Sequence, residues 1–317
     1  MTRLPLAHET WLTRDDVAVD WDFVFEGLTL ALLAAAVLVT LAIRLAARRW
    51  PGVDVPLLAR MAPFMPFAVR IHLAVSLIGL VSLGYYLSPA MDLQDDVAGI
   101  LLGAVMVIVA VAMVVGFQVR AAAWLLVAAG PLGMLEFGVS PVVQRIDVLG
   151  PAVFLLFAGA GRWSAEFELG RVRDPSPEAI ARAVWALRVF AGVALIVVAF
   201  VEKIGQPDLA LHFLAEHPQF NVAREVGLPM GDLEFARLAG AIEVLFGLLL
   251  ISGALPQAIV IIAGIPFNAT LWFFGNVELV GHLPVYGTML VLLVYGSSPQ
   301  LRPLTSRLWP WRAAAAP

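Results

Sequence analysis

The chain has 317 residues, of which 61% are hydrophobic and 14% are charged, and its mean hydropathy is +0.90. Soluble domains carry about 25% charged residues, so this composition excludes an ordinary water-soluble domain and indicates a lipid environment. The net charge of -4 offers no basic excess for nucleic acid, and the lack of cysteine excludes disulfides, thiolate metal ligands and a Cys-x-x-Cys redox cycle within the chain.

Nine apolar runs predict transmembrane helices, because a helix needs about 20 mostly apolar residues to cross a hydrocarbon core of roughly 30 Å. The predicted spans, in chain order, are residues 23–45, 67–88, 97–117, 121–138, 147–162, 185–204, 234–252, 257–274 and 283–296. We therefore predict an all-α integral membrane protein with about nine transmembrane helices.

Basic residues are concentrated in one set of alternate connections between these spans. Fourteen of the 20 basic residues belong to that set, and the other six are Arg3, Arg14, Arg145, Lys203, Arg224 and Arg237. Because loops rich in arginine and lysine stay on the cytoplasmic side, the N-terminus is predicted outside and the C-terminus in the cytoplasm. We expect the membrane to be a bacterial cell membrane.

The chain also resembles itself at a constant offset of 137 residues. Four glycines of one copy align with four of the other: Gly103 with Gly240, Gly116 with Gly253, Gly138 with Gly275 and Gly150 with Gly287. The preceding helices align at an offset of 118, which pairs Arg70 with Arg188 and implies a 19-residue insertion (137 minus 118) in the second copy. Each copy holds four spans, an even number, so the two repeats are predicted to be parallel rather than inverted.

This similarity divides the chain into five predicted parts. They are an external N-terminal segment (1–22), a leading transmembrane helix with a cytoplasmic loop (23–66), a first four-helix repeat with a cytoplasmic linker (67–184), a second four-helix repeat (185–297) and a cytoplasmic tail (298–317). The first repeat is expected to be mainly scaffold, with Arg145 and Asp147 forming a local ion pair.

Polar side chains are concentrated in the second repeat. A charged side chain within a bilayer costs about 2.5–3.5 kcal/mol on insertion scales, so such residues are usually paired or functional. They are Glu202, Lys203, Glu243 and Asn268 within or at the ends of predicted helices, and Asn276, Glu278 and His282 in the connection before the last helix. At a rise of about 1.5 Å per residue, Lys203, Glu243, Asn268 and His282 all fall in the outer half of the membrane, where we expect them to converge.

Each of these residues also has a purely structural interpretation. Lys203, the only lysine in the chain, could be an ordinary snorkelling side chain, but we expect it to interact with Glu243. A buried Glu243 could only join two helices, and Asn268 could make an interhelical amide contact. His282 could carry a proton or be a satisfied structural group.

Several pieces of the second repeat carry a family resemblance. They are Arg188 at the start of its first helix, Val201-Glu202-Lys203-Ile204-Gly205, the segment from Ala239 to Gly247, Gly253, and Gly281-His282-Leu283-Pro284. On these residues the segment 188–297 resembles the DoxX family of small four-helix membrane proteins, while the first repeat shares only the glycine frame. The resemblance implies a membrane protein associated with redox enzymes, since similar subunits belong to thiosulfate:quinone oxidoreductase.

The leading hypothesis is a quinone-linked redox membrane subunit in the lipid bilayer, with a protein partner from a redox complex. Its candidate catalytic residues are Lys203, Glu243 and His282, and its candidate cofactor-binding residues are Asn268, Glu202 and Asn276; no metal is predicted. The alternatives are a non-enzymatic scaffold or assembly factor, for which Phe213, Leu214 and Phe220 in the outer insertion would form the docking surface, and a transporter of lipids or small molecules. Whether the chain is itself catalytic stays open.

Overall fold

The computed structural model describes residues 18–311, apart from the side chains of Phe273 and Asn276. Within that range the chain is helical and forms no β-strand, with a single isolated bridge between Tyr85 and Asp92. Seven of the described helical segments are long and apolar enough to cross a membrane: Gly27–Ala46, Ala62–Ser82, Val97–Val115, Val119–Phe137, Pro177–Ile204, Asp232–Ser252 and Val277–Gly296. The protein is an all-α membrane protein, as its composition predicts.

Two further apolar helices fall short of the length of a full span. They are Ile146–Ala158, which combines η2 (Ile146–Val148) with α9 (Leu149–Ala158), and Pro256–Trp272 in α15 (Pro256–Phe274). Both correspond to predicted spans, and both adjoin the candidate site described below.

The long helices are the frame of the molecule. They are α3 (Gly27–Ala46), α5 (Met65–Ser82), α6 (Val97–Val115), α7 (Val119–Phe137), α11 (Pro177–Ala199), α14 (Asp232–Ser252) and α16 (Asn276–Gly296). The short elements between them are α2 (Trp21–Phe25), α4 (Pro56–Ala59), η1 (Ala62–Phe64), α8 (Val139–Gln144), α10 (Ala165–Glu168), η3 (Phe200–Ile204), α12 (Pro207–Glu216), η4 (Pro218–Phe220), α13 (Val222–Glu225) and α17 (Arg302–Thr305).

Two predicted boundaries move outward in the structure. Helix α11 begins at Pro177 rather than near residue 185, because the Ser176 hydroxyl caps its first turn and proline fits the first helical position. Helix α16 begins at Asn276 rather than residue 283, so Glu278 and His282 lie in its first turns and not in a connection. Pro284 lies within this helix and does not start it.

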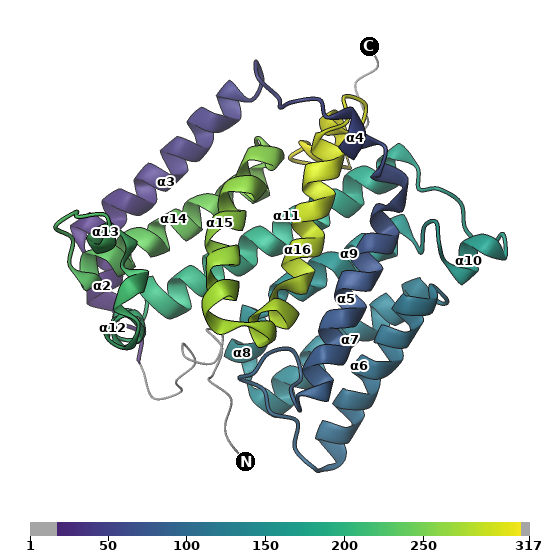
Figure 1. Ribbon diagram of the computed structural model, residues 1–317, viewed down its shortest axis with the longest axis horizontal. Coiled ribbons are helices and arrows are strands. Elements are labelled where there is room, and N and C mark those ends of the chain that lie inside the picture. Colours follow the sequence, from purple (N-terminus) through teal and green to yellow (C-terminus); the bar gives the residue numbers. More distant parts are fainter. Residues whose placement is uncertain (1–17, 312–317) are drawn as a thin grey trace.

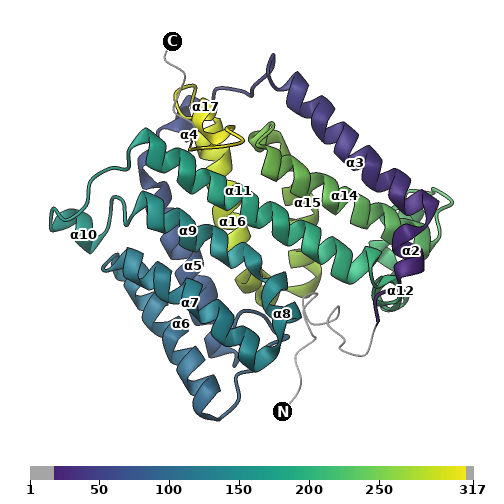
Figure 2. The same ribbon diagram turned by 180° about the vertical axis from the view of Figure 1, so that it is seen from behind.

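The helices form two four-helix groups that meet in the middle of the molecule. One group contains α5, α6, α7 and α9, and the other contains α11, α14, α15 and α16; α3 packs on α14 at the edge away from α6 and α7 (Figure 1). The groups join mainly through two pairs, α5 with α16 and α9 with α11, and the reverse view shows α11 beside α9 (Figure 2). The first helix of each group thus contacts the last helix of the other.

A buried arginine near the start of each group caps another helix of the same group. Arg70 on α5 donates to the carbonyl oxygens of Met113, Ala160 and Trp163, and is fully buried. The carbonyls at the end of a helix lack intrahelical donors and carry partial negative charge, so a guanidinium at the end of α6 satisfies them and is stabilised there.

Arg188 on α11 does the same at the end of α14. Its guanidinium donates to the carbonyl oxygens of Leu250 at 3.0 Å, Ile251 at 3.1 Å and Arg307 at 2.6 Å. The terminating Gly253 has φ of +70°, and a Cβ there would lie 2.2 Å from Arg188 Nη1. Only glycine therefore allows both the turn and the close approach of the arginine.

The turns around the third helix of each group also match. Helices α7 and α15 follow residues in the left-handed region, Gln118 with φ of 53° and Leu255 with φ of 43°, which are 137 residues apart. The same helices end at Gly138 and Gly275, which both have positive φ and have the same separation. The two groups therefore use the same unusual backbone conformations at aligned positions.

Candidate functional site

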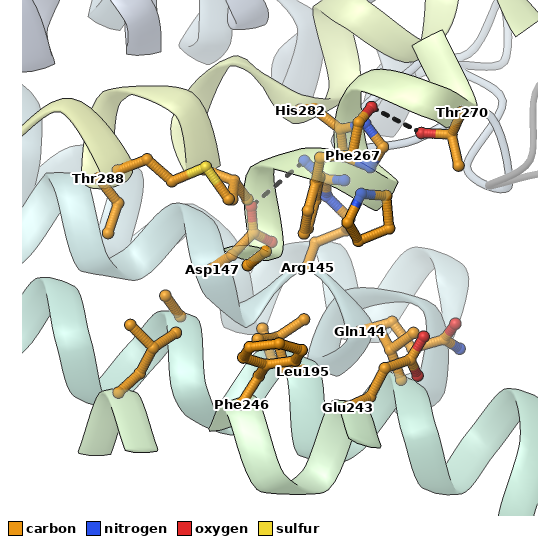
Figure 3. Close-up of a pocket in the computed structure, with 18 of the residues that line it drawn as sticks. Gln144, Arg145, Asp147, Leu195, Glu243, Phe246, Phe267, Thr270, His282 and Thr288 are labelled. Atoms are coloured by element: carbon orange, nitrogen blue, oxygen red, sulfur yellow. Dashed lines mark hydrogen bonds and ion pairs between the residues drawn. The ribbon is translucent and has the colours of Figure 1, made fainter. Parts of the chain in front are cut away.

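A cavity of about 220 Å³ lies where the two four-helix groups meet. Its walls are mainly apolar and come from α11, α14, α15 and α16, with Leu195, Phe246, Val260, Phe267 and Met289 among the lining residues. Its polar lining residues come from both groups and are Ser88, Gln144, Arg145, Asp147, Glu202, Glu243, Thr270, His282 and Thr288. In Figure 3 the Arg145–Asp147 pair lies between His282 and Phe267 on one side and Leu195 and Phe246 on the other.

Lys203 joins the two glutamates that line the cavity. Its Nζ lies 3.2 Å from Glu202 Oε2 and 3.1 Å from Glu243 Oε1. The expected Lys203–Glu243 interaction is therefore present, and the lysine side chain is only 14% exposed. Since Lys203 itself does not line the cavity, it acts on the site by holding the two carboxylates in place.

A π-helical turn places Glu202 and Lys203. Residues Phe200–Ile204 form this turn at the end of α11, whereas α5 of the first group stops at Ser82, the residue that aligns with Phe200. In a π-helical turn the backbone hydrogen bonds span five residues instead of four, and such turns are frequent at functional sites. This turn is therefore a structural feature of the second group that brings two charged residues to the cavity.

Close packing of α14 on α11 brings Glu243 to Lys203. A Cβ at Gly240 would lie 3.2 Å from the Cβ of Lys203, and one at Gly247 would lie 2.5 Å from the carbonyl oxygen of Gly192. Small residues three and four positions from Glu243 let the two helices approach, as is common between membrane helices. The short distance between Lys203 and Glu243 depends on these glycines.

His282 and Glu278 form a second polar pair on α16. His282 Nδ1 lies 3.6 Å from Glu278 Oε1, one helical turn away, and the Glu278 side chain is fully buried. The imidazole packs edge-on against Phe267 of α15, with ring centroids 4.9 Å apart. The two side chains lie close together because α16 begins before Glu278. The predicted span began at residue 283, so the sequence pattern placed both residues in a connection instead.

The first group contributes charge to the cavity through Arg145 and Asp147. These residues form the expected ion pair, with Arg145 Nη2 3.6 Å from Asp147 Oδ2, but they do more than hold the first group together. Arg145 Nη2 also donates to the carbonyl oxygen of Gly281 at 2.7 Å. The expectation that this group is mainly scaffold is therefore incomplete. A sequence signal existed, because Arg145 aligns with His282 at the offset of 137.

Asn268 does not join the other candidate residues. Its amide Nδ2 donates to the carbonyl of Gly264 at 2.6 Å, its Oδ1 accepts from the Tyr286 hydroxyl at 3.5 Å, and the side chain is exposed on the outer face of α15. The expected convergence of Lys203, Glu243, Asn268 and His282 is wrong for this residue. The Asn276 side chain lies outside the described part of the structure, so its expected role stays a prediction.

No protein-family model, curated protein or solved structure matches this chain. Fold and site define an all-α membrane protein with a mainly apolar cavity between two helical groups, and Glu202, Glu243, His282, Arg145 and Asp147 are among the polar residues that line it. Among residues 18–311, no three side chains of His, Asp and Glu are grouped as a metal site.

Proposed function

We propose that this chain is a quinone-linked redox membrane subunit, related to the DoxX family, that binds a quinone ring in the central cavity. The observation that carries the proposal is the cavity itself: an apolar pocket among membrane helices with proton-carrying and hydrogen-bonding groups gathered in it. Small-molecule sites are mostly apolar with a few well-placed polar groups, and ionisable residues within a membrane frequently mark pathways of protons or substrates.

The size and lining of the cavity fit an aromatic-sized ring. Its volume of about 220 Å³ is below the roughly 300–1,000 Å³ of sites for drug-sized ligands, so it suits a single ring rather than a whole lipid-soluble molecule. The rings of Phe246 and Phe267 line it and offer stacking surfaces. Arg145 and His282 supply nitrogen donors suited to carbonyl oxygens.

The carboxylates and the histidine are the groups that would exchange protons. A bound quinone supplies two-electron, two-proton chemistry, and the electrons would be exchanged with a redox partner protein. Glu202 and Glu243 both contact one ammonium, that of Lys203, and both line the cavity, so two carboxyl groups lie where they could exchange a proton with a bound ring. His282, which lies one helical turn from Glu278, is the third group that could do so.

We also propose that the architecture is a leading helix followed by two parallel four-helix repeats, nine membrane helices in all. The paired capping arginines, the positive-φ residues at an offset of 137 and the reciprocal α5–α16 and α9–α11 contacts support a duplication. The two short helices, α9 and α15, are then the fourth helix of the first repeat and the third of the second. The proposed orientation places α12 and α13 outside a bacterial cell membrane and α4 and α17 in the cytoplasm.

A second candidate function, a scaffold for a partner enzyme, is favoured by one observation. On the α12–α13 side Val222, Val226 and Leu228 are 59%, 73% and 54% exposed, whereas Phe213 and Leu214, expected to form a docking surface, are buried in a local aromatic core. An exposed apolar patch outside the membrane helices is typical of an interaction site.

Quinone binding by the purified protein tests the proposed function. Glu243→Gln and Lys203→Met should each weaken binding of a tail-less benzoquinone about tenfold, while Glu234→Gln, an exposed glutamate on the same helix, should bind as the wild type does. Unchanged binding in both site variants, or none in the wild type, would contradict the proposal. Co-purification of a stable enzyme partner without any bound small molecule would favour the scaffold.

A further inference from the structure

A groove between α15 and α16 opens on the lipid-facing side of the second group. It is lined by apolar Val260, Ile261, Ile265 and Met289, by Gly264, and by Asn268 and Tyr286, which contact each other. Ile261 and Ile265 are 60% and 68% exposed, so the groove lies on the outer surface of the helix bundle, which faces lipid in a membrane. Since Asn268 donates to the carbonyl of Gly264, its amide is satisfied locally.

The groove and the central cavity share part of their walls. Val260 and Met289 line both of them. The side chains of Val260 on α15 and Met289 on α16 therefore form a single layer between the central cavity and the groove.

The two helices that form this wall each contain a proline. Pro266 lies inside α15 and Pro284 inside α16, within two helical turns of Val260 and Met289 respectively. A proline inside a helix removes the hydrogen bond to the carbonyl four residues earlier and weakens the helix locally. The backbone of both helices is therefore weaker near this wall than it would be without proline.

We propose that this groove binds the apolar chain of an amphiphilic ligand whose ring occupies the cavity, with Val260 and Met289 as the portal between the two. The inference rests on the proposed function and adds to it a second binding site and a chemical class, a ring bearing a long isoprenoid or alkyl chain. A cavity of about 220 Å³ suits the ring alone, so under this proposal a chain attached to the ring leaves the cavity. The groove offers an apolar surface within the membrane on the other side of a single layer of side chains.

Gly264→Leu is the variant that fills the groove with least disturbance elsewhere. A Cβ at Gly264 meets only the amide of Asn268, at 3.9 Å, so a leucine there extends into open space. Gly130→Leu is the matched control, because Gly130 lies in α7 of the first group and a Cβ there meets nothing within 4 Å. Ile261→Trp is a second groove variant should Gly264→Leu fail to fold.

The experiment compares a tail-less benzoquinone with the same ring carrying a decyl chain, for binding to the full-length protein in lipid nanodiscs. The groove variants should weaken binding of the decyl form about tenfold and leave the tail-less form and the Gly130→Leu control unchanged. Equal binding of the decyl form by wild type and groove variants would overturn the inference while leaving the proposed function intact. An equal loss for both ligands would also overturn it, since it would report a distorted cavity. If the wild type binds neither ring, the proposed function fails and the inference falls with it.

Discussion

Arg145 and Gly281 are joined by a hydrogen bond of 2.7 Å, from the guanidinium Nη2 to the carbonyl oxygen, although 136 residues separate them. Arg145 also pairs with Asp147, so one side chain connects the turn after α8 with the first turns of α16. Both Arg145 and His282, the neighbour of Gly281, line the cavity. The contact between the two helical groups is thus also part of the candidate site.

Replacing Arg145 by leucine should destabilise the protein markedly. A buried hydrogen bond to a charged group contributes about 1.5–3 kcal/mol, and Asp147 would lose its ion-pair partner in an apolar setting. The free energy of unfolding in detergent should fall by about that amount. Arg162→Leu is the control, because its ion pair with Asp174 is 40% and 47% exposed and should matter by less than about 1 kcal/mol. Equal effects of the two substitutions would contradict the assigned role of Arg145.

Lys203 and Glu243 should be energetically coupled. The pair is partly buried, with Lys203 14% and Glu243 29% exposed, so removing one partner should cost less than for a fully buried pair, about 3–5 kcal/mol, and more than for an exposed one, about 0.2–1 kcal/mol. Replacing both leaves no uncompensated charge between them. Lys203→Met combined with Glu243→Gln should therefore destabilise the protein by less than the sum of the single changes, with a coupling energy of about 1–3 kcal/mol in unfolding measurements. Glu202 remains near in both backgrounds, so strictly additive effects would mean that Lys203 pairs with Glu202 alone.

Gly247 should tolerate no side chain. A Cβ at this position would lie 2.5 Å from the carbonyl oxygen of Gly192, a backbone atom that can move only if the helices separate. Gly247→Ala should cost about 1–3 kcal/mol through overpacking and should also weaken ligand binding, because it pushes Glu243 away from Lys203. Gly130→Ala, which meets nothing within 4 Å, should be neutral or stabilise the helix slightly. Thermal unfolding of the two variants separates these outcomes.

The proposed orientation can be tested with single cysteines, since the natural chain has none. Val226→Cys on the α13 side and Leu57→Cys in α4 are 73% and 72% exposed positions at opposite ends of the molecule (Figure 1). In intact cells a membrane-impermeant maleimide should label Val226→Cys, and Leu57→Cys should react only after permeabilisation. The reverse pattern would invert the orientation, and labelling of both from outside would contradict the span assignment.

Parts of this structure follow from the sequence by simple physical rules. Apolar length predicts the membrane helices, and depth along two helices predicts the Lys203–Glu243 contact. The start of α16 differs from the prediction because Asn276 to His282 is polar enough to be typical of a connection, whereas in the structure this segment is helical and Glu278 is buried one turn from His282. Helix boundaries of this kind are set by tertiary packing and not by local composition.

Asn268 shows why the face of a helix could not be predicted. Helix α15 has apolar residues on both its buried and its exposed face: Ile259 and Val260 are buried, while Ile261 and Ile265 are exposed. In lipid both faces can be apolar, so hydrophobic periodicity does not indicate which one points inward. Similarly, the position of Arg145 in the cavity depends on how the two groups dock, which the internal alignment suggests only through its match to His282.

The most direct test of the central claim is mass spectrometry of the small molecules that remain with the wild-type protein after extraction in mild detergent. If the cavity is a quinone site, the wild type should retain a quinone at about one molecule per chain, and both Glu243→Gln and Lys203→Met should retain much less at equal protein yield. A wild-type protein that is folded yet carries no quinone, even when it is extracted with native lipids and supplied with a quinone, would contradict the account.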